Sequence, residues 1–392
     1  MIGGFMQQMR RRTPLGWLQL RHDKTRVLVA MAGIAFADIL IFMQLGFRDA
    51  FFDSNTMLPR SLEADLILIS PRAREMTRLY TFPRRRLFQA MDVPGVNSVE
   101  ALYVSFLDWK KPQTQQKTQM LVVGQNPSKP AFDLPAINRQ LSAIKQPDTV
   151  LFDATSRGNY QEVIARLQTG ENITSEIDRI TVTIAGTFNL GASFAVDGTL
   201  IASQQTFLRL FPRWQVGTVS IGKIKLESGT DPEVIRTALN EYLPDDVRAL
   251  THAEYIDFEL NYWNTRSPIA FIFGLGSTMG FIVGVVIVYQ VLSTDVNAHL
   301  SEYATFKAMG YRDRYLLGVV FEEAIILAVL GFVPGVAVST GLYALTRKAT
   351  ALPIVLPLGR VVFVFALTIV MCGFSGAIAT RRLRSADPAD IF

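Results

Sequence analysis

Three carboxylates in this sequence stand where an ionised group is costly. Asp38, Glu322 and Glu323 lie inside stretches that are otherwise almost entirely apolar. Such a group costs at least about 2.5–3.5 kcal/mol inside a membrane, so it must face protein, be paired or be neutral. For Asp38 a functional role and a structural hydrogen bond are both open. Glu322 and Glu323 stand nearer the end of their stretch, which favours snorkelling or pairing with the basic flanks.

Residues 300–310 form a second candidate, one for recognition rather than catalysis. The segment predicts a short helix that Gly310 ends. Its bulky side chains recur three residues apart and therefore share one side of the helix. A stripe of this kind is typical of a helix that docks into a groove of a soluble partner. The residues expected to contact that partner are Glu302, Tyr303, Phe306, Lys307, Met309 and Gly310.

Motifs for nucleotide binding and for catalysis are missing from the sequence. It contains no G-x-x-x-x-G-K-[ST] and no H-E-x-x-H, and its one cysteine, Cys372, has no partner for a disulfide. The three histidines, His22, His252 and His299, are far apart in the sequence. We therefore expect a chain that is not an enzyme and that binds no cofactor or metal itself.

Four long apolar stretches must position these residues. They are predicted as membrane-spanning helices over 27–47, 267–292, 315–345 and 361–380, each close to the roughly 20 residues needed to cross a bilayer. The first is too long for the apolar part of a signal peptide and is predicted to be an anchor. In the second, Gly276, Gly280 and Gly284 fall four residues apart. This spacing favours close helix packing, although glycine is also simply common in membrane helices.

The basic residues predict the orientation of the chain in the membrane. Arginine and lysine are concentrated before the first stretch and after the fourth, so both termini are expected in the cytoplasm. Residues 48–266 are then expected on the periplasmic side of an inner membrane. We attribute the net charge of +5 to basic residues that set the orientation in the membrane and contact lipid headgroups, rather than to a nucleic-acid site.

The periplasmic domain shows strand-helix-strand patterns at both ends. One runs over residues 64–107; the other runs over 218–250, with a capping box predicted at Thr230–Glu233 to open its helix. We expect a porter-like subdomain from about 48–109 and 216–266, with a β-rich insertion at about 110–215. The predicted fold class is an α-helical membrane protein with four transmembrane helices plus a large α+β periplasmic domain.

The remaining segments are short. Residues 1–26 are predicted as a cytoplasmic interfacial helix, with a plain basic flank as the alternative. Residues 293–314 are the cytoplasmic connection that holds the predicted docking helix. Residues 346–360 form a periplasmic loop, and 381–392 a cytoplasmic tail.

The cytoplasmic segment also resembles a known family. Residues 302–310, Glu-Tyr-Ala-Thr-Phe-Lys-Ala-Met-Gly, look like the E-[FY]-[AG]-x-[LF]-[KR]-A-[ILM]-G signature of FtsX/MacB-type permeases of ABC transporters. The basic ending over 381–392 is similar to the family's A-x-x-D-P-A-type ending. Residues 35–50 resemble the DevC-like branch, which is found in cyanobacteria. Ser301 departs from the pattern, since many relatives have Arg before the Glu.

The resemblance implies a function and a set of partners. It implies a homodimeric permease with a DevA-type ATPase dimer that binds ATP and Mg, a DevB-type membrane fusion protein and a TolC-like outer-membrane channel. The motion driven by the ATPase would be transmitted to the periplasmic domain and would push cargo, for DevC-like members a heterocyst glycolipid, into the channel. The alternative is an FtsX-like regulator that drives a periplasmic enzyme or senses a ligand without transport.

Overall fold

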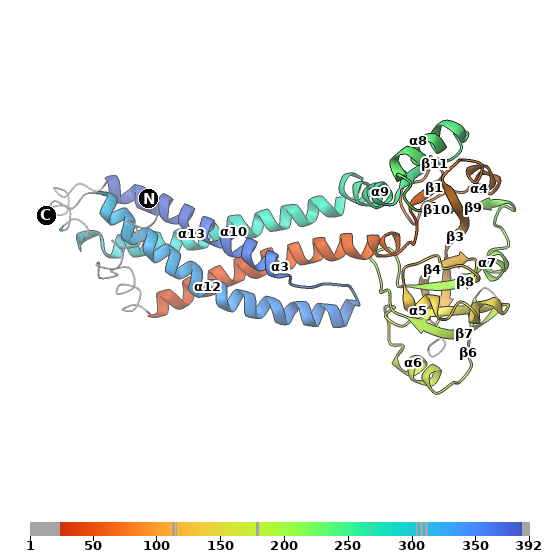
Figure 1. Ribbon diagram of the computed structural model, residues 1–392. Helices are drawn as coiled ribbons and strands as arrows, with labels where there is room; N and C mark the ends of the chain where they lie inside the picture. The colour runs from red at the N-terminus through yellow and green to blue at the C-terminus, as the bar shows by residue number, and fades with distance from the viewer. Residues whose placement is uncertain are drawn as a thin grey trace. The chain divides into compact units, whose positions relative to one another are not determined.

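The structure is a computed structural model that describes residues 24–111, 114, 116–177, 180–266, 268–302, 305, 309 and 313–385. The chain divides into two units (Figure 1). Unit 1 holds the described residues up to Arg48, together with Phe271–Leu345 and those from Ile354 onward. Unit 2 holds Asp49–Ala270 and Thr346–Pro353. The boundary between the units falls inside helices, so single helices contribute residues to both.

Unit 1 consists of long apolar helices. They are α3 (Lys24–Arg60), α10 (Pro268–Ala298), α12 (Asp313–Thr350) and α13 (Leu358–Ser385), of which α3, α10 and α12 continue into unit 2. By length and composition, four helices among the described residues are suited to crossing a membrane: Lys24–Arg60, Pro268–Ala298, Leu317–Thr350 and Leu358–Thr380. Helix α3 extends past the predicted end at residue 47. Helix α10 extends past the predicted end at residue 292, and its last turns have a partner on another helix.

Unit 2 is built on one nine-stranded sheet with the order β11-β1-β10-β3-β4-β8-β5-β7-β6. A separate pair joins the short strands β2 and β9. The strands are β1 (Leu66–Ile69), β2 (Phe82–Pro83), β3 (Val96–Lys110), β4 (Lys117–Gln125), β5 (Thr149–Asp153), β6 (Ile173–Ile177), β7 (Ile180–Phe188), β8 (Gly198–Ser203), β9 (Thr218–Val219), β10 (Ile221–Leu226) and β11 (Arg248–Thr251). Core residues pack on both faces of this sheet.

The helices of unit 2 connect and cover these strands. They are α4 (Arg85–Ala90), α5 (Pro135–Asn138), the 3-10 turn η1 (Ala143–Lys145), α6 (Gln161–Gln168), α7 (Gln204–Leu210), α8 (Pro232–Tyr242) and α9 (His252–Thr265). Leu87 of α4 and Leu239 of α8 belong to one core cluster, and Tyr255 of α9 belongs to the other. Helix α9 therefore packs on the opposite face of the sheet from α4 and α8.

The two predicted strand-helix-strand patterns form one half of the sheet. They are β1-α4-β3 and β10-α8-β11, and their strands interleave in the order β11-β1-β10-β3 with antiparallel neighbours. This is the arrangement of a split βαβ, or ferredoxin-like, unit. The predicted fold class, four membrane-type helices plus a large domain of strands and helices, is confirmed.

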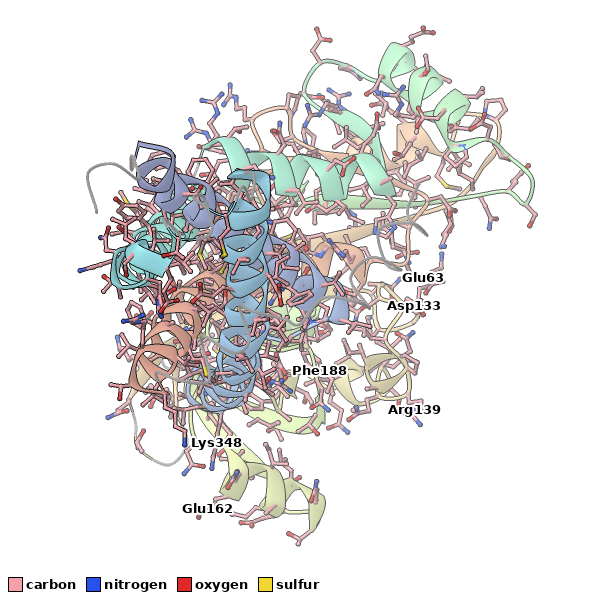
Figure 2. All side chains as sticks on the ribbon, turned by 90° about the vertical axis from the view of Figure 1, so that its left-hand side faces the viewer. Glu63, Asp133, Arg139, Glu162, Phe188 and Lys348 are labelled. Carbon is pink, nitrogen blue, oxygen red and sulfur yellow. The ribbon has the colours of Figure 1, made fainter. Side chains whose placement is uncertain are left out.

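The middle of the domain continues the same sheet. Strand β3 is 15 residues long, pairs with β10 through its first half and with β4 through its second, and so joins both parts. Strand β8 then pairs in parallel with β4 and antiparallel with β5. A further bridge connects Leu62 to Phe132, and the neighbouring Glu63 and Asp133 lie side by side in Figure 2. The predicted insertion is thus not separated from the porter-like part by a break in the sheet.

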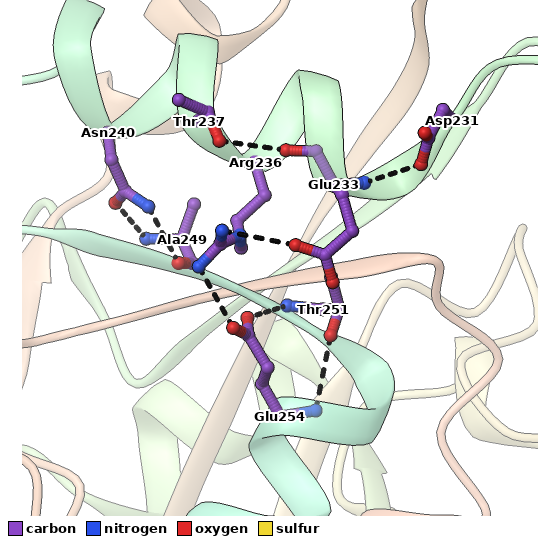
Figure 3. A network of polar contacts seen from close by, with 8 residues as sticks. All are labelled: Asp231, Glu233, Arg236, Thr237, Asn240, Ala249, Thr251 and Glu254. Atoms are coloured by element: carbon purple, nitrogen blue, oxygen red, sulfur yellow. Dashed lines mark hydrogen bonds and ion pairs between the residues drawn. The ribbon is translucent and has the colours of Figure 1, made fainter.

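Helix caps set the positions of α8 and α9 (Figure 3). Asp231 caps α8 by accepting a hydrogen bond from the backbone of Glu233, so the predicted cap at Thr230 is wrong by one residue. Pro232 takes the first helical position, where its missing N–H costs nothing. A capping box is present at the next helix instead, where Thr251 and Glu254 cap α9. Arg236 of α8 pairs with Glu254 at 2.9 Å and ties the two helices together.

Candidate functional site

The glycine stripe of α10 lies against α3. A Cβ at Gly280 would lie 3.1 Å from the Cγ1 of Ile41, and one at Gly284 would lie 2.9 Å from the Cβ of Ala37. Gly276 meets the side chain of Gln44 in the same way. As residue numbers rise along α10 they fall along α3, so the two helices are antiparallel. Their backbones approach so closely that a larger residue would displace the neighbouring helix.

Helix α12 packs against α3 in the parallel sense. Gly331 lies against Ile34, and a Cβ at Gly335 would lie 3.1 Å from the Cβ of Asp38. One turn after Ser339, Tyr343 donates a hydrogen bond to the backbone carbonyl of Phe42. Small residues thus recur every four positions on the face of α12 that meets α3. Helix α3 therefore contacts both α10 and α12.

Asp38 lies at this crossing and is fully buried. The hydroxyl of Thr368, on α13, donates to its Oδ1 at 2.7 Å and also lies 2.8 Å from the carbonyl of Val364. Among the described residues, Asp38 Oδ2 has no hydrogen-bond partner, and neither has the buried Ser339 Oγ. Asp38 therefore faces protein and joins α3 to α13, as a carboxyl group in this setting must.

We expect Asp38→Asn to assemble normally and to retain most of the activity of a complex with the ATPase that the family resemblance implies. The asparagine carbonyl can accept the same hydrogen bond from Thr368, so the contact between α3 and α13 survives. The cost in stability should stay at about 1 kcal/mol, the value of one net hydrogen bond. Size-exclusion profiles and the ATPase rate of the complex measure both properties. Loss of activity in an intact complex would mean that the charge or the proton of Asp38 is required.

A second group of charged residues joins three helices at the other end of the bundle. Arg26 of α3 donates to Asp295 of α10, whose side chain is only 5% exposed. Glu323 of α12 is buried and lies within hydrogen-bonding reach of the same carboxylate. His299 Nδ1 lies 3.5 Å from Asp295 Oδ1. One arginine thus faces two buried carboxylates. One of these, Asp295, shortly precedes in the sequence the segment that is predicted to dock a partner.

The other predicted site residues do not join either of these two groups. Glu322 is half-buried and lies one position before Glu323, so it faces a different direction on α12. In the predicted docking segment, Glu302 is exposed and Met309 is 61% exposed. The hydroxyl of Thr305 donates a hydrogen bond to the carbonyl of Ser301, and the N–H of Met309 donates one to the carbonyl of Thr305. In both bonds the donor and the acceptor are four residues apart, as in a helix. The predicted contact residues Tyr303, Phe306, Lys307 and Gly310 lie outside the described residues, as do 1–23 and 386–392.

Sequence reasoning missed several polar residues of the bundle. Arg26 was assigned to a basic flank and Asp295 to a loop, and Thr368 was read as part of an apolar span. The sequence did hold one signal for Asp295 and His299. They are a carboxylate and a histidine four residues apart at the end of an apolar stretch, a spacing that places both on one side of a helix. Their partners on other helices could not be read from the sequence.

Unit 2 contains a buried carboxylate that the sequence did not single out. Glu259, on α9, is fully buried, and neither carboxylate oxygen has a hydrogen bond of good geometry among the described residues. Burial is the main reason that its pKa rises to about 8, and the nearby carboxylate of Glu75 adds to the effect. Tyr255, one turn earlier, directs its hydroxyl to the sulfur of Met76 at 3.2 Å. The backbone N–H of Thr77 donates a hydrogen bond to Glu75 Oε2 at 2.6 Å.

These features define a class of protein: a membrane protein with four apolar helices and a large domain of strands and helices between the first two. Residues 274–388, less than half of the chain, match the family described as FtsX-like permease C-terminal. This part is therefore similar to an FtsX-like permease domain, and together with the four apolar helices it indicates a protein of the inner membrane. Permeases of this family generally act as non-catalytic subunits of transporters. No match was found among curated proteins.

Three solved structures have some similarity to this chain. The periplasmic region of MacB from Actinobacillus actinomycetemcomitans shares 10% identity at a TM-score of 0.34, covering 52% of this chain and 95% of that one. The extracellular domain of the noncanonic ABC-type transporter YknZ from Gram-positive bacteria shares 13% identity at a TM-score of 0.30, covering 48% and 100%. A domain of a putative permease protein from Porphyromonas gingivalis shares 13% at 0.29, covering 49% and 89%. Similarity at this level carries no conclusion about function.

Proposed function

We propose that this chain is the permease subunit of a MacB-type ABC exporter of the DevC-like branch. It would transmit motion from a separate ATPase to the domain over 48–266 and push an amphiphilic cargo toward a fusion protein and an outer-membrane channel. The resemblance to DevC-like members suggests a heterocyst glycolipid as that cargo. The observation that carries the proposal is the FtsX-like match over residues 274–388, which includes the predicted docking segment.

The packing of unit 1 supports a role in transmitting motion. Helix α3 contacts α10 through its glycine stripe, α12 along a parallel seam and α13 through Asp38 and Thr368. Helix α3 continues without interruption to Arg60 and so contributes residues to unit 2 as well. Rigid helices that pack closely are suited to relaying a displacement rather than to lining a wide pore.

The proposed assembly has two copies of this chain and an ATPase dimer. Both termini and residues 293–314 would lie in the cytoplasm, and 48–266 would lie in the periplasm beside a DevB-type fusion protein and a TolC-like channel. ATP and Mg would bind to the DevA-type ATPase and not to this chain, whose sequence lacks a P-loop. The helix predicted over 300–310 would dock into the ATPase, directly after the group that contains Asp295 and His299.

The ATPase partner provides the decisive test. The purified chain is expected to bind no nucleotide, whereas its complex with the ATPase should hydrolyse ATP. Phe306→Ala should weaken ATPase binding by about 1–3 kcal/mol, the usual cost of truncating an interface anchor. Glu302→Lys should weaken it further, because it reverses a charge at the contact. Titrated pull-down of the ATPase with each variant measures the change.

Phe363→Ala is the matched control for this test. It removes the same side chain from a position on α13 that is 56% exposed and far along the chain from the docking segment. ATPase binding should not change in this variant. Nucleotide binding by the chain alone, or full ATPase binding by both docking variants, would contradict the proposal. An FtsX-like regulator would show the same ATPase binding but no ATP-dependent release of lipid from reconstituted complexes.

A further inference from the structure

A groove of about 480 Å³ lies within unit 2, between α9 and the loop that follows β1. Volumes of this size are typical of sites for small ligands. The residues that matter for its chemistry are Arg74 from the loop and, from α9 and its end, Phe258, Asn261, Tyr262, Thr265 and Arg266. None of these residues takes part in the function proposed above.

One face of α9 forms the wall of this groove. Phe258, Asn261, Tyr262 and Thr265 follow the i, i+3, i+4, i+7 spacing that places side chains on a single side of a helix. The buried residues Tyr255 and Glu259 hold the other side against the sheet. The capping box and the ion pair between Arg236 and Glu254 secure the start of the helix (Figure 3). The groove therefore has a rigid wall.

The groove is positively charged. Among the described residues, neither Arg74 nor Arg266 has a carboxylate within ion-pair distance. The guanidinium of Arg248 lies 5.2 Å from the centre of the Phe258 ring, and its buried Nε has no described hydrogen-bond partner. Two acidic side chains close in sequence to the groove already have partners: Glu75 accepts from Thr77, and Glu254 pairs with Arg236. Two lining guanidinium groups without an ion-pair partner among the described residues, with a third behind the Phe258 ring, favour an anionic ligand.

The groove also has an apolar side, and it lies next to a membrane span. The rings of Phe258 and Tyr262 line it beside the arginines. Arg266 precedes Pro268, the first residue of α10, by two positions. Two trans peptide bonds span at most about 8 Å, so the groove opens close to the membrane surface. Aromatic and arginine side chains at this level are suited to contact both headgroups and the upper part of acyl chains.

We propose that this groove binds an anionic phospholipid, with the phosphate between Arg74 and Arg266 and the glycerol backbone against Phe258 and Tyr262. The lipid would come from the leaflet next to unit 2. This inference goes beyond the proposed function, since it requires neither an ATPase nor a cargo. A bound lipid would hold α9 at the membrane surface next to the start of α10.

The test uses the full chain in nanodiscs of phosphatidylcholine that contain a trace of photoreactive phosphatidylglycerol. After illumination, peptide mass spectrometry reads the site of labelling. We expect the peptide with residues 258–266 to be labelled by the phosphatidylglycerol probe much more than by a phosphatidylcholine probe. In Arg74→Gln/Arg266→Gln this labelling should fall at least about tenfold, because each arginine near a membrane surface contributes a factor of about five.

Arg84→Gln/Arg85→Gln is the matched control. It removes the same charge from two exposed positions at α4, on the opposite face of the sheet, and should leave the labelling of 258–266 unchanged. Inorganic phosphate should not displace the probe, because it cannot use the apolar side of the groove. Equal labelling by the two lipid probes, or full labelling of the Arg74/Arg266 variant, would overturn the proposal. Displacement by inorganic phosphate would also overturn it, in favour of a soluble anion.

Discussion

Unit 2 is expected to lose stability as the pH rises from about 5 to about 9, because Glu259 must ionise in a buried place. The pKa of Glu259 rises from 4.5 to about 8, mainly because the group is buried and in part because Glu75 is near. Tyr255 and the backbone of Met76 lie near Glu259 and lower its pKa in part, without offsetting the effect of burial. No cation described next to Glu259 offsets the cost.

The direction follows from proton binding in the two states. Below pH 4.5 the folded and unfolded chains both hold the proton, and Glu259 costs nothing. Between 4.5 and about 8 the folded chain holds a proton that the unfolded chain has lost, so stability falls as pH rises. Above this range the loss is complete. It is on the order of 3–5 kcal/mol, because a difference of one in pKa corresponds to about 1.4 kcal/mol.

Hydrogen exchange of the α9 backbone in the full chain measures this effect locally. Glu259→Gln should match the wild type at pH of about 5 and should be better protected at about 9, since the amide does not ionise. Asp257→Asn, at an exposed position of the same helix, should follow the wild type at both values. If the protection of α9 changes with pH in the same way in the wild type and in Glu259→Gln between about pH 5 and about pH 9, Glu259 ionises without cost.

Arg26→Leu is expected to destabilise the helix bundle by about 3–5 kcal/mol, the usual cost of breaking a buried ion pair. The change leaves the buried carboxylates of Asp295 and Glu323 next to each other without the arginine that faces them. The unfolding midpoint in detergent and the fraction assembled with the ATPase measure the loss. Because the group directly precedes the predicted docking segment, assembly should suffer together with stability.

The double variant Arg26→Leu/Asp295→Leu should recover much of this loss. Removing both partners leaves no uncompensated charge between these two positions, and an apolar pair of similar volume is often neutral or stabilising. Asp108→Ala serves as a control, since its pair with Lys117 is exposed on both sides, and exposed pairs contribute at most about 1 kcal/mol. A double variant as unstable as Arg26→Leu alone would mean that Arg26 acts through contacts other than Asp295.

The large divisions of this chain could be predicted because their signals are local. An apolar stretch of about 20 residues needs no information from elsewhere to indicate a spanning helix, and alternating or helical periodicity indicated most strands and helices at the two ends of unit 2. The glycines at 276, 280 and 284 could be placed on one helix face for the same reason. Which helix they meet, α3, appears only in the folded bundle.

Pairings between distant segments were decided by the tertiary structure. Strand β1 lies between β10 and β11, which follow it by some 150 residues or more, and β3 joins both parts of the sheet because it is long enough to pair with β10 and β4. The partner of Asp38, Thr368, is 330 residues away in the sequence. Helix α10 continues through Asp295, whose carboxylate pairs with Arg26 of a different helix.

The amino-acid sequence alone determined that this chain has apolar spans, a charge asymmetry and no P-loop. Each of these features depends only on which residues follow one another along a short segment. The sequence did not determine which polar residues are buried. Glu259 reads as an ordinary residue of an amphipathic helix, and Arg74 and Arg266 read as surface charges. The packing of α9 against the sheet buries the carboxylate and brings the two arginines to one groove. Burial and convergence depend on neighbours that are distant in the sequence, and only the folded chain supplies them.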